Sequence, residues 1–539
     1  PPCLTTRSIK DARSPLETSF SFSRYSLYRR ARMDQLLKID LPKDFSQESL
    51  MAFYEELTQV VHPAALIAAA CVVLYTFFCV LQSLLRDSKL PPIVSGWIPF
   101  VGAGIQFVKD PLALARRNIT RHGECFTLSM FGQRLTFFVG PTAHKFFFCR
   151  KDEELSQREV YTFSVPIFGE NIVYDCDEGT RLEQFRLLAL ALKGEKVKSY
   201  TPIILREAED YFKQWTGEGK VCLRSAMSEL IILTASRALM GDEVRENLFA
   251  DVSRLYSQLD EGLKPISFFL PYLPIPAHKR RDAAREEMIQ LFSKVIKKRR
   301  EEGRHGDDML QVFMDGQYKD GRKFTDQEVT GLLIALLFAG QHTSSVSSTW
   351  TGLLVLDQKE KYWPRLQEEN KKILKKFDNK ITFEALQEME MLGACIREAI
   401  RMYPPLIFLM RKVKKDLTFQ GENRQYKIPK GDIAFVSPAA GMRYPGSFTN
   451  PDTYDPERFM APREEDKAKS YAWIGFGGGR HGCMGEIYAY LQIKIIWTVL
   501  LRDFDMTLDG ALPKPNYEAL VVGPANPCDV IYKRTNTQK

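Results

Sequence analysis

The sequence predicts a mainly α-helical (α+β) protein, with a large helical domain, a small β-rich part and one N-terminal membrane-anchor helix. Three observations lead to this expectation. Long stretches show the apolar spacing of helices, only a few short stretches alternate as strands do, and an uncharged run of 22 residues lies toward the N-terminal end.

The composition excludes several classes of protein. The chain has 539 residues, 45% apolar and 26% charged, so it is neither collagen-like, coiled-coil, wholly disordered nor a multi-span membrane protein. A net charge of +8 is small for this length, and nucleic acid is not expected as a partner. The ten cysteines include no C-x-x-C pair, which argues against a zinc ribbon and against a disulfide framework.

The N-terminal end divides into predicted segments. Residues 64–85 carry no charge and would span about 30 Å as a helix, so we expect an uncleaved transmembrane anchor rather than a core helix or signal peptide. Acidic residues before it and basic residues after it place the rest of the chain in the cytoplasm. Residues 1–62 form a lead, of which 1–32 are interpreted as a transit peptide or a translated upstream region. Residues 86–104 form a Pro/Gly connector to one large domain, residues 105–539.

Within the large domain, apolar periodicity is clearest in residues 281–302 and 329–356, and both are expected to be helices. Residues 126–130 and 135–139 alternate around a Gly-Gln turn and predict a β-hairpin, and residues 425–438 predict a second short strand pair. No fixed-period repeat is present, so this domain is expected to form one unit.

The most informative stretch is FGGGRHGCMG, residues 476–485, which precedes an apolar helix candidate, residues 487–501. Glycines allow close approach of a flat ligand, and a Cys at a helix start meets free N–H groups that favour its thiolate. An axial ligand of haem iron requires this arrangement. Two alternatives stay open on spacing alone. The glycines also spell the dinucleotide-binding G-x-G-x-x-G after a strand-like segment, residues 471–476, and a lone Cys in a glycine turn is most often only buried.

The pattern F-x-x-G-x-x-x-C-x-G resembles the haem-binding signature of cytochrome P-450 monooxygenases, and its members here are Phe476, Gly479, Cys483 and Gly485. Two further motifs of that family precede it. Glu398 and Arg401 match E-x-x-R, and Arg458 matches the arginine of P-E-R-F, which joins that pair in a buried network of the family. The resemblance covers residues 91–532. It implies the cytochrome P-450 fold, haem b (iron protoporphyrin IX) as cofactor, and Cys483 as the axial ligand of the haem iron.

The predicted helix 329–356 contains AGQHTSS, residues 339–345, although polar residues are costly to bury. In the family this helix crosses the oxygen-binding face of the haem, and the resemblance implies that Thr343 helps to supply protons. Most members carry an acid before that Thr, whereas His342 stands here. His342 and His481 together reproduce signatures of the sterol 14α-demethylases, in which Asp260 matches the acid that pairs with this His. Imidazole can pass a proton near neutral pH.

The aromatic loop of residues 161–175 resembles the loop that roofs the substrate cavity of that subfamily, although such loops are usually core covers. The resemblance implies that Tyr161 and Tyr174 donate hydrogen bonds to the haem propionates. It further implies that the propionate charge is neutralised by Arg186, Arg411 and His481, since a buried carboxylate needs a charged partner. The residues expected to shape the sterol cavity are Phe163, Phe168, Leu263 and Ala339.

The resemblance implies an enzyme of sterol biosynthesis that removes a 14α-methyl group as formate in three successive oxidations. The expected co-substrate is O2, the expected electron donor is NADPH–cytochrome P-450 reductase, and azole inhibitors are expected ligands. The resemblance also implies that Phe163 favours 4-monomethyl sterols such as obtusifoliol over 4,4-dimethyl ones such as lanosterol.

The anchor implies contact with membrane lipid and a single-pass location in the endoplasmic reticulum membrane, with the catalytic domain, residues 105–539, in the cytoplasm. Two alternatives remain: a haem-thiolate monooxygenase of another lipid, and a non-catalytic sterol- or haem-binding protein. The pairing of His342 with Thr343 argues against the second, because a sensor needs no proton relay.

Overall fold

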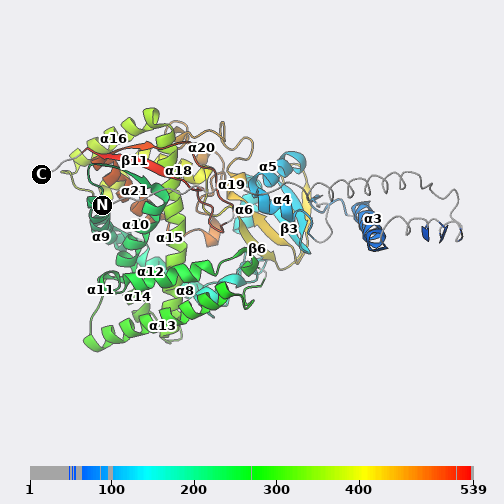
Figure 1. Ribbon diagram of the computed structural model, residues 1–539, viewed down its shortest axis with the longest axis horizontal. Coiled ribbons are helices and arrows are strands. Elements are labelled where there is room, and N and C mark those ends of the chain that lie inside the picture. Colours follow the sequence, from blue (N-terminus) through cyan, green and yellow to red (C-terminus); the bar gives the residue numbers. More distant parts are fainter. Residues whose placement is uncertain are drawn as a thin grey trace, which may run out of the picture. The chain divides into compact units, whose positions relative to one another are not determined.

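The computed structural model describes residues 48, 51–52, 54–55, 63–84, 87–94, 101–192, 194–268, 270–517 and 519–535 (Figure 1). The chain forms two compact units, Pro1–Asp87 and Ser88–Lys539. Most of the lead predicted for residues 1–62 lies outside the described residues, as do Leu85, Arg86 and residues 95–100 of the predicted connector.

The first unit contains the helix α3 (Pro63–Leu84), which covers the predicted anchor except its last residue. It has 22 residues, no charged residue in its end turns, and a length of about 33 Å at 1.5 Å per residue. The side chains of Ile67, Val73, Leu74 and Phe77 are each at least 64% exposed. Exposing apolar side chains to water costs free energy, whereas exposing them to the hydrocarbon of a lipid bilayer does not.

The second unit is mainly helical. Its helices are α4 (Gly104–Lys109), α5 (Pro111–His122), α6 (Pro141–Cys149), α7 (Val165–Phe168), α8 (Glu178–Ala191), α9 (Gly194–Lys213), α10 (Leu223–Ala235), α11 (Asp242–Asn247), α12 (Phe249–Glu261), α13 (Pro276–Glu302), α14 (Met309–Asp315), α15 (Asp326–Asp357), α16 (Lys359–Lys376), α17 (Phe383–Gln387), α18 (Glu390–Met402), α19 (Pro438–Gly441), α20 (Glu465–Ala468) and α21 (Glu486–Asp503). Short 3-10 turns are η1 (Thr162–Ser164), η3 (Pro265–Phe268), η4 (Pro456–Phe459) and η5 (Gly479–His481), and η2 (Ser236–Met240) is a π-helix. The helices predicted at 281–302, 329–356 and 487–501 correspond to α13, α15 and α21.

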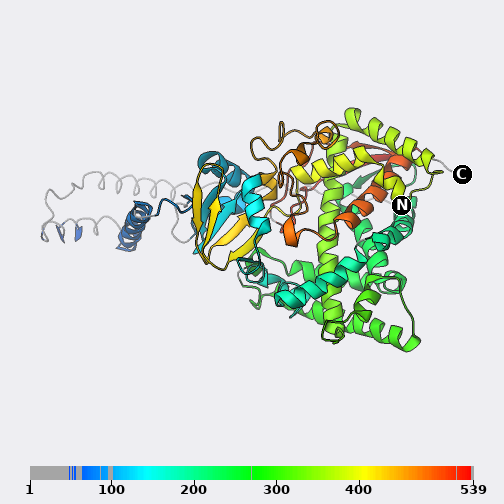
Figure 2. The same ribbon diagram turned by 180° about the vertical axis from the view of Figure 1, so that it is seen from behind.

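The strands form three sheets. They are β1 (Ile93–Val94), β2 (Cys125–Met130), β3 (Gln133–Phe138), β4 (Leu155–Ser156), β5 (Glu218–Cys222), β6 (Leu409–Val413), β7 (Leu417–Gln420), β8 (Gln425–Ile428), β9 (Ile433–Val436), β10 (Phe504–Leu508) and β11 (Asp529–Arg534). The orders are β1-β2-β3-β9-β6-β4, β10-β11-β5 and β7-β8. The six-stranded sheet lies at one side of this unit (Figures 1 and 2).

The pairing of the strands differs in part from the prediction. The antiparallel hairpin of β2 and β3 was expected, and Phe126 pairs with Phe137 in it. The second predicted pair is wrong as a pair, because β8 pairs with β7 whereas β9 pairs with β3 and β6. The segment 471–476 is not a strand but a series of turns, which removes the βα arrangement that a dinucleotide loop would need. The connector also contributes β1, which pairs with β2.

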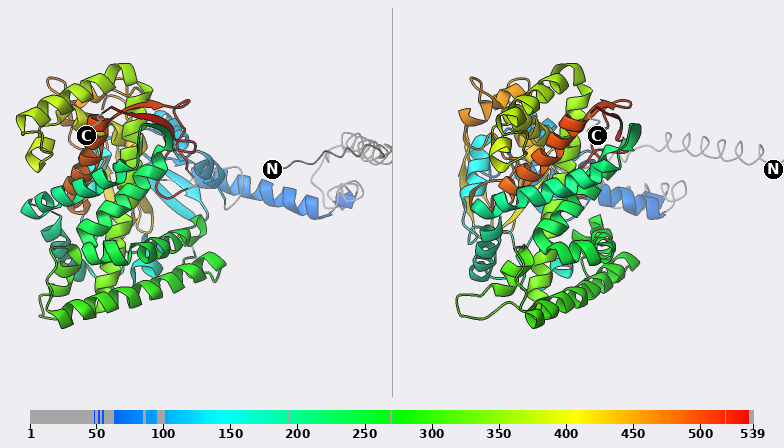
Figure 3. Two further views of the ribbon diagram at one scale, coloured as in Figure 1. Left: turned by 60° about the vertical axis from the view of Figure 1, so that its left-hand side comes forward. Right: turned by 90° about the vertical axis from the view of Figure 1, so that its left-hand side faces the viewer.

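Helix α15 passes through the middle of the helical part, and α13 lies at its edge (Figures 1 and 3). Thr325 caps α15 by accepting a hydrogen bond from Glu328 N–H, and the Glu328 carboxylate accepts one from Thr325 N–H. By its length and apolar composition, α15 could also cross a membrane. Because 67% of its apolar stretch is buried in protein, it is a core helix.

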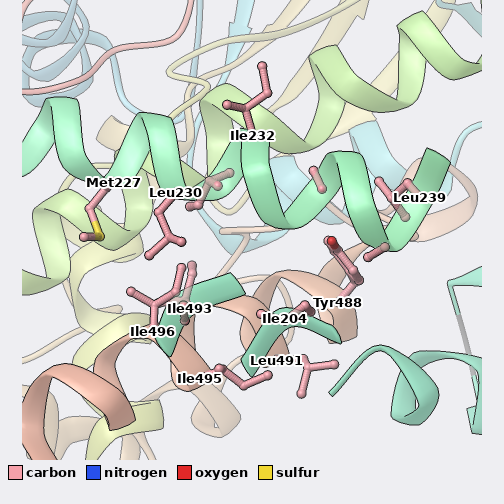
Figure 4. Close-up of a cluster of buried hydrophobic side chains, with 14 of the residues drawn as sticks. Ile204, Met227, Leu230, Ile232, Leu239, Tyr488, Leu491, Ile493, Ile495 and Ile496 are labelled. Carbon is pink, nitrogen blue, oxygen red and sulfur yellow. The ribbon is translucent and has the colours of Figure 1, made fainter. Parts of the chain in front are cut away.

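The main apolar core joins α9, η2, α10 and α21, where side chains such as Ile204, Leu230 and Leu491 interdigitate (Figure 4). Branched residues on facing helices exclude water and stabilise the helical part in proportion to the buried apolar area. This packing holds α21, which follows the segment 476–485, in a fixed place beside α9 and α10.

Candidate active site

The cysteine of residues 476–485 lies in a tight glycine loop before α21. Its N–H donates to Phe476 O at 2.9 Å, which closes the loop. Gly479 has φ +63°, and a Cβ there would lie 2.2 Å from Phe148 O, so only glycine fits. The loop is therefore held against α6 by a contact that no other residue permits.

Cys483 is accessible to solvent yet closely surrounded by protein, which places its thiol at an internal space. A backbone hydrogen bond from Gly485 lowers the pKa of the thiol, but burial outweighs it and raises that pKa. The N–H group at the helix start thus acts in the predicted direction, and burial opposes it. Coordination to a metal ion deprotonates a thiol outright.

A face of α15 is left uncovered in the middle of an otherwise buried helix. Ala339 is exposed, Gly340, His342 and Thr343 are half-buried, and the residues from Ser344 to Leu356 are buried. A Cβ on Gly340 would meet no described atom within 4 Å. The Thr343 hydroxyl donates to Ala339 O at 2.7 Å, the bond to the residue four positions earlier that helical Thr side chains commonly make. A flat group could lie against this face.

His342 and Asp260 meet beside this face. Asp260 is the penultimate residue of α12, and the distance from its Oδ1 to His342 Nε2 is 3.0 Å. The two side chains are 28% and 42% exposed, so the pair connects the helix interior with solvent. The structure thus brings together the three residues for which the sequence predicted a proton relay, Thr343, His342 and Asp260.

A cationic cluster lies beside the cysteine loop. Arg411 of β6, Arg181 of α8, Arg480 and His481 lie close together, with two carboxylates beside them. Asp152 pairs with Arg181 and His481, and Glu178 accepts a hydrogen bond from Arg480 at 2.6 Å. The distance from His481 Nε2 to Asp152 Oδ1 is 2.6 Å. Burial, with the neighbouring Arg181 and Arg480, lowers the pKa of Arg411 to about 10. Burial and the three arginines lower the pKa of His481 to about 3. The cluster therefore has an excess of positive charge in a poorly solvated place.

Two nitrogens of the cluster, Arg411 Nε and His481 Nδ1, are buried and have no hydrogen-bond partner among the described residues. Tyr161 and Tyr174 stack with ring centroids 4.6 Å apart, and a backbone hydrogen bond joins Tyr161 to Met410, next to Arg411. Burial, and the nearby Cys483, raise the pKa of Tyr174 far above its usual range. The tyrosines, the cluster and the cysteine thus border one space.

Arg186 does not join this cluster. Its Nη2 donates to Gln317 O on the exposed side of α8, so the structure does not support its predicted contact with a propionate. Arg181, which sequence reasoning missed, occupies the inner side instead and forms an ion pair with Asp152. The helical spacing could have indicated this choice. Arg181, Gln184 and Leu188 lie on one buried face of α8, and Arg186 lies on another face.

The three residues predicted to lock the scaffold form one fully buried network. Glu398 Oε2 accepts from Arg401 Nε at 2.6 Å, and Glu398 Oε1 accepts from Arg458 Nε at 3.0 Å. All three side chains are 0% exposed. Arg458 also bonds to Thr449 O and Glu465, so the network ties α18 to the segment that precedes the cysteine loop.

The predicted substrate residues come from three elements. Phe163 of η1 is buried against Phe268 and Tyr161, at ring distances of 4.3 and 5.7 Å. Phe168 of α7 packs on Phe338 of α15 at 6.0 Å. Leu263, just after α12, is half-buried against the main core, and Ala339 lies on the uncovered face of α15.

A family model described as Cytochrome P450 matches residues 91–531. The chain belongs to the cytochrome P450 family. It is 47% identical to the sterol 14-demethylase of Arabidopsis thaliana over 470 residues, which cover 87% of this chain and 96% of that protein. It is 48% identical to the obtusifoliol 14-alpha demethylase of Sorghum bicolor over 448 residues (83% and 91%), and 38% identical to the lanosterol 14-alpha demethylase of Bos taurus over 455 residues (83% and 88%).

A solved structure confirms the predicted fold class. The retinoic acid-bound cyanobacterial cytochrome P450 superposes with a TM-score of 0.73 at 23% identity, covering 83% of this chain and all of that one. The cytochrome P450 is accordingly a haem-thiolate monooxygenase with haem b as its cofactor, as the sequence predicted.

The residues of this cytochrome P450 fit haem b. Cys483 offers a sulfur ligand to iron, the uncovered face of α15 accommodates a flat ring, and the cationic cluster offers N–H donors to two propionates. Within the described ranges, no group of three or more His, Cys, Asp or Glu side chains is placed so that it could hold a metal ion.

Proposed function

We propose that this cytochrome P450 is a sterol 14α-demethylase that removes the 14α-methyl group as formate in three successive oxidations. The observation that carries the proposal is the His342–Asp260 pair at 3.0 Å beside Thr343, on the uncovered face of α15. The names of its plant and animal relatives agree with this substrate class.

Haem held by Cys483 would activate O2, and each oxidation would use one O2 and two electrons that the reductase delivers from NADPH. The chain's own residues bind, orient and move protons. Asp260 exchanges protons with solvent and passes them to His342, and the Thr343 hydroxyl carries them to the haem side of α15. Arg411, His481, Tyr161 and Tyr174 hold the propionates, and Glu398 with its two arginines keeps the cysteine loop in place.

We propose a 4-monomethyl sterol such as obtusifoliol as the preferred substrate. Phe163 presents a large ring that Phe268 and Tyr161 hold in place, so the cavity wall beside it is bulky and rigid. The Sorghum and wheat relatives carry the name obtusifoliol 14-alpha demethylase.

We also propose that α3 anchors the enzyme in the endoplasmic reticulum membrane as a single span, with the catalytic domain in the cytoplasm. Its uncharged sequence and exposed apolar side chains support this. The electron donor is then an NADPH–cytochrome P450 reductase of the same membrane.

The test is a spectral titration of the ferric protein with obtusifoliol and with lanosterol. Sterol binding is expected to shift the Soret band from the low-spin to the high-spin position, at lower concentration for obtusifoliol. If haem is bound but neither sterol shifts the band while another lipid does, the enzyme acts on that lipid and the substrate assignment fails.

A further inference from the structure

A chain of two hydrogen bonds, the first buried and the second partly buried, begins one residue away from His342. The Tyr256 hydroxyl on α12 donates to Gln341 Oε1 on α15 at 3.3 Å, and Gln341 Nε2 donates to Ser228 Oγ on α10 at 2.8 Å. Tyr256 and Gln341 are each only 4% exposed. Three helices are thus joined by polar contacts at the level of the His342–Asp260 pair.

The Tyr256 hydroxyl is the donor to Gln341 in the structure. Burial, and to a lesser extent the charge of Asp260, raise the pKa of Tyr256 well above its usual range, so its hydroxyl keeps the proton that it donates. Gln341 accepts through Oε1, and its amide N–H group donates to Ser228. Removing any member leaves a buried polar group without its partner.

Helices α12 and α15 contact each other at two successive turns. Tyr256 and Asp260 lie one turn apart on α12, and Phe338 and His342 lie one turn apart on α15. The Tyr256 ring is 4.6 Å from the Phe338 ring and 5.7 Å from the imidazole of His342. The distance between α12 and α15 at Tyr256 therefore determines the distance between the side chains of Asp260 and His342.

The His342–Asp260 pair cannot hold this geometry by itself. Both partners are partly exposed, and ion pairs in such positions contribute little, about 0–1 kcal/mol. The buried neighbours are the rigid part of the arrangement, and the exposed pair takes its spacing from them.

We infer that Tyr256, Gln341 and Ser228 are positioning residues for proton delivery and act through His342. The inference rests on the proposed function, in which His342 and Asp260 form the proton relay. When one of these hydrogen bonds is removed, the distance between α12 and α15 increases and proton transfer from Asp260 to His342 becomes slower. More of the electrons from NADPH then reduce O2 to hydrogen peroxide instead of oxidising the sterol.

The test uses the full-length holoenzyme with reductase and sterol, and Tyr256→Phe, which removes one oxygen atom. Formate produced per NADPH consumed is expected to fall about three- to tenfold, the effect of one neutral hydrogen bond, with a matching rise in hydrogen peroxide. Haem content and the sterol-induced Soret shift are expected to stay native. Ser228→Ala should act in the same direction. Tyr200→Phe is the matched control, because that buried hydroxyl has no partner among the described residues, and native coupling is expected.

A double-mutant cycle with His342→Ala separates positioning from general destabilisation. If Tyr256 acts through His342, the Tyr256→Phe change has no further effect on coupling in the His342→Ala protein; additive losses would overturn the inference. Poor coupling in His342→Ala with native coupling in Tyr256→Phe would overturn the inference alone. Native coupling in His342→Ala would overturn the proposed relay and the inference with it.

Discussion

His144 of α6 gives a quantitative prediction about the pH dependence of stability. The side chain is fully buried, its Nδ1 donates to Tyr471 O at 3.0 Å, and its Nε2 accepts from Gly140 N–H at 3.2 Å. The ring also fills the space against Gly441, where a Cβ would lie 2.4 Å from it. A neutral imidazole satisfies both bonds, and a protonated one would break the second.

Burial lowers the pKa of His144 from 6.5 to about 4. Between these values the unfolded chain binds the proton and the folded protein does not, so protonation favours unfolding. The free energy of unfolding is unaffected above about pH 7 and falls as the pH drops from 6.5 toward 4. At 1.36 kcal/mol for each pKa unit, the loss is about 3 kcal/mol, a large part of typical domain stability.

The assay is denaturant unfolding of the native protein and of His144→Gln between pH 7.5 and 4.5. Gln keeps one donor and one acceptor but does not titrate, so the variant should lose less stability on acidification. The gap between the two curves should widen by about 2–3 kcal/mol. Parallel pH profiles for the native protein and His144→Gln would refute the reasoning.

Three further predictions concern the site. Glu398→Gln removes the carboxylate between two fully buried guanidinium groups and should lower the free energy of unfolding by about 3–5 kcal/mol, measured by thermal denaturation with haem retention followed at the Soret band; a loss below about 1 kcal/mol would contradict a buried network. Arg181→Met should speed transfer of haem to an apoprotein acceptor about tenfold, whereas Arg186→Met should leave it native, and equal rates would show that the cluster does not hold the propionates. Phe163→Leu should narrow the difference between obtusifoliol and lanosterol dissociation constants by about tenfold in Soret titrations, and an unchanged ratio would exclude this ring as the selector.

The motif residues could be predicted from sequence because their spacing is local. Cys483 lies in a ten-residue glycine loop whose backbone conformation is set by glycine at positive φ, and Glu398 and Arg401 lie one helical turn apart. Arg458 came from its own local motif. The fold class followed from the same short-range signals, summed over many helices.

The residues and pairings that sequence missed depend on contacts between distant segments. Arg186 and Arg181 differ only in which face of α8 they occupy, and that face is defined by packing against other elements. The strands β8 and β9 were predicted as a pair because they are adjacent in sequence, yet β9 finds its partners in β3 and β6. Tyr256 carries no motif, and only the approach of α12 to α15 shows its contact with Gln341.

The central claim is that this cytochrome P450 releases the 14α-methyl group of a sterol as formate. In the most direct measurement, the full-length protein is incubated with its reductase, NADPH and obtusifoliol that carries an isotope label in the 14α-methyl carbon. We expect labelled formate and the 14-demethylated sterol with a new 14,15 double bond in equal amounts, at three O2 consumed per formate. Tight sterol binding with O2 consumption but no labelled formate would contradict the account.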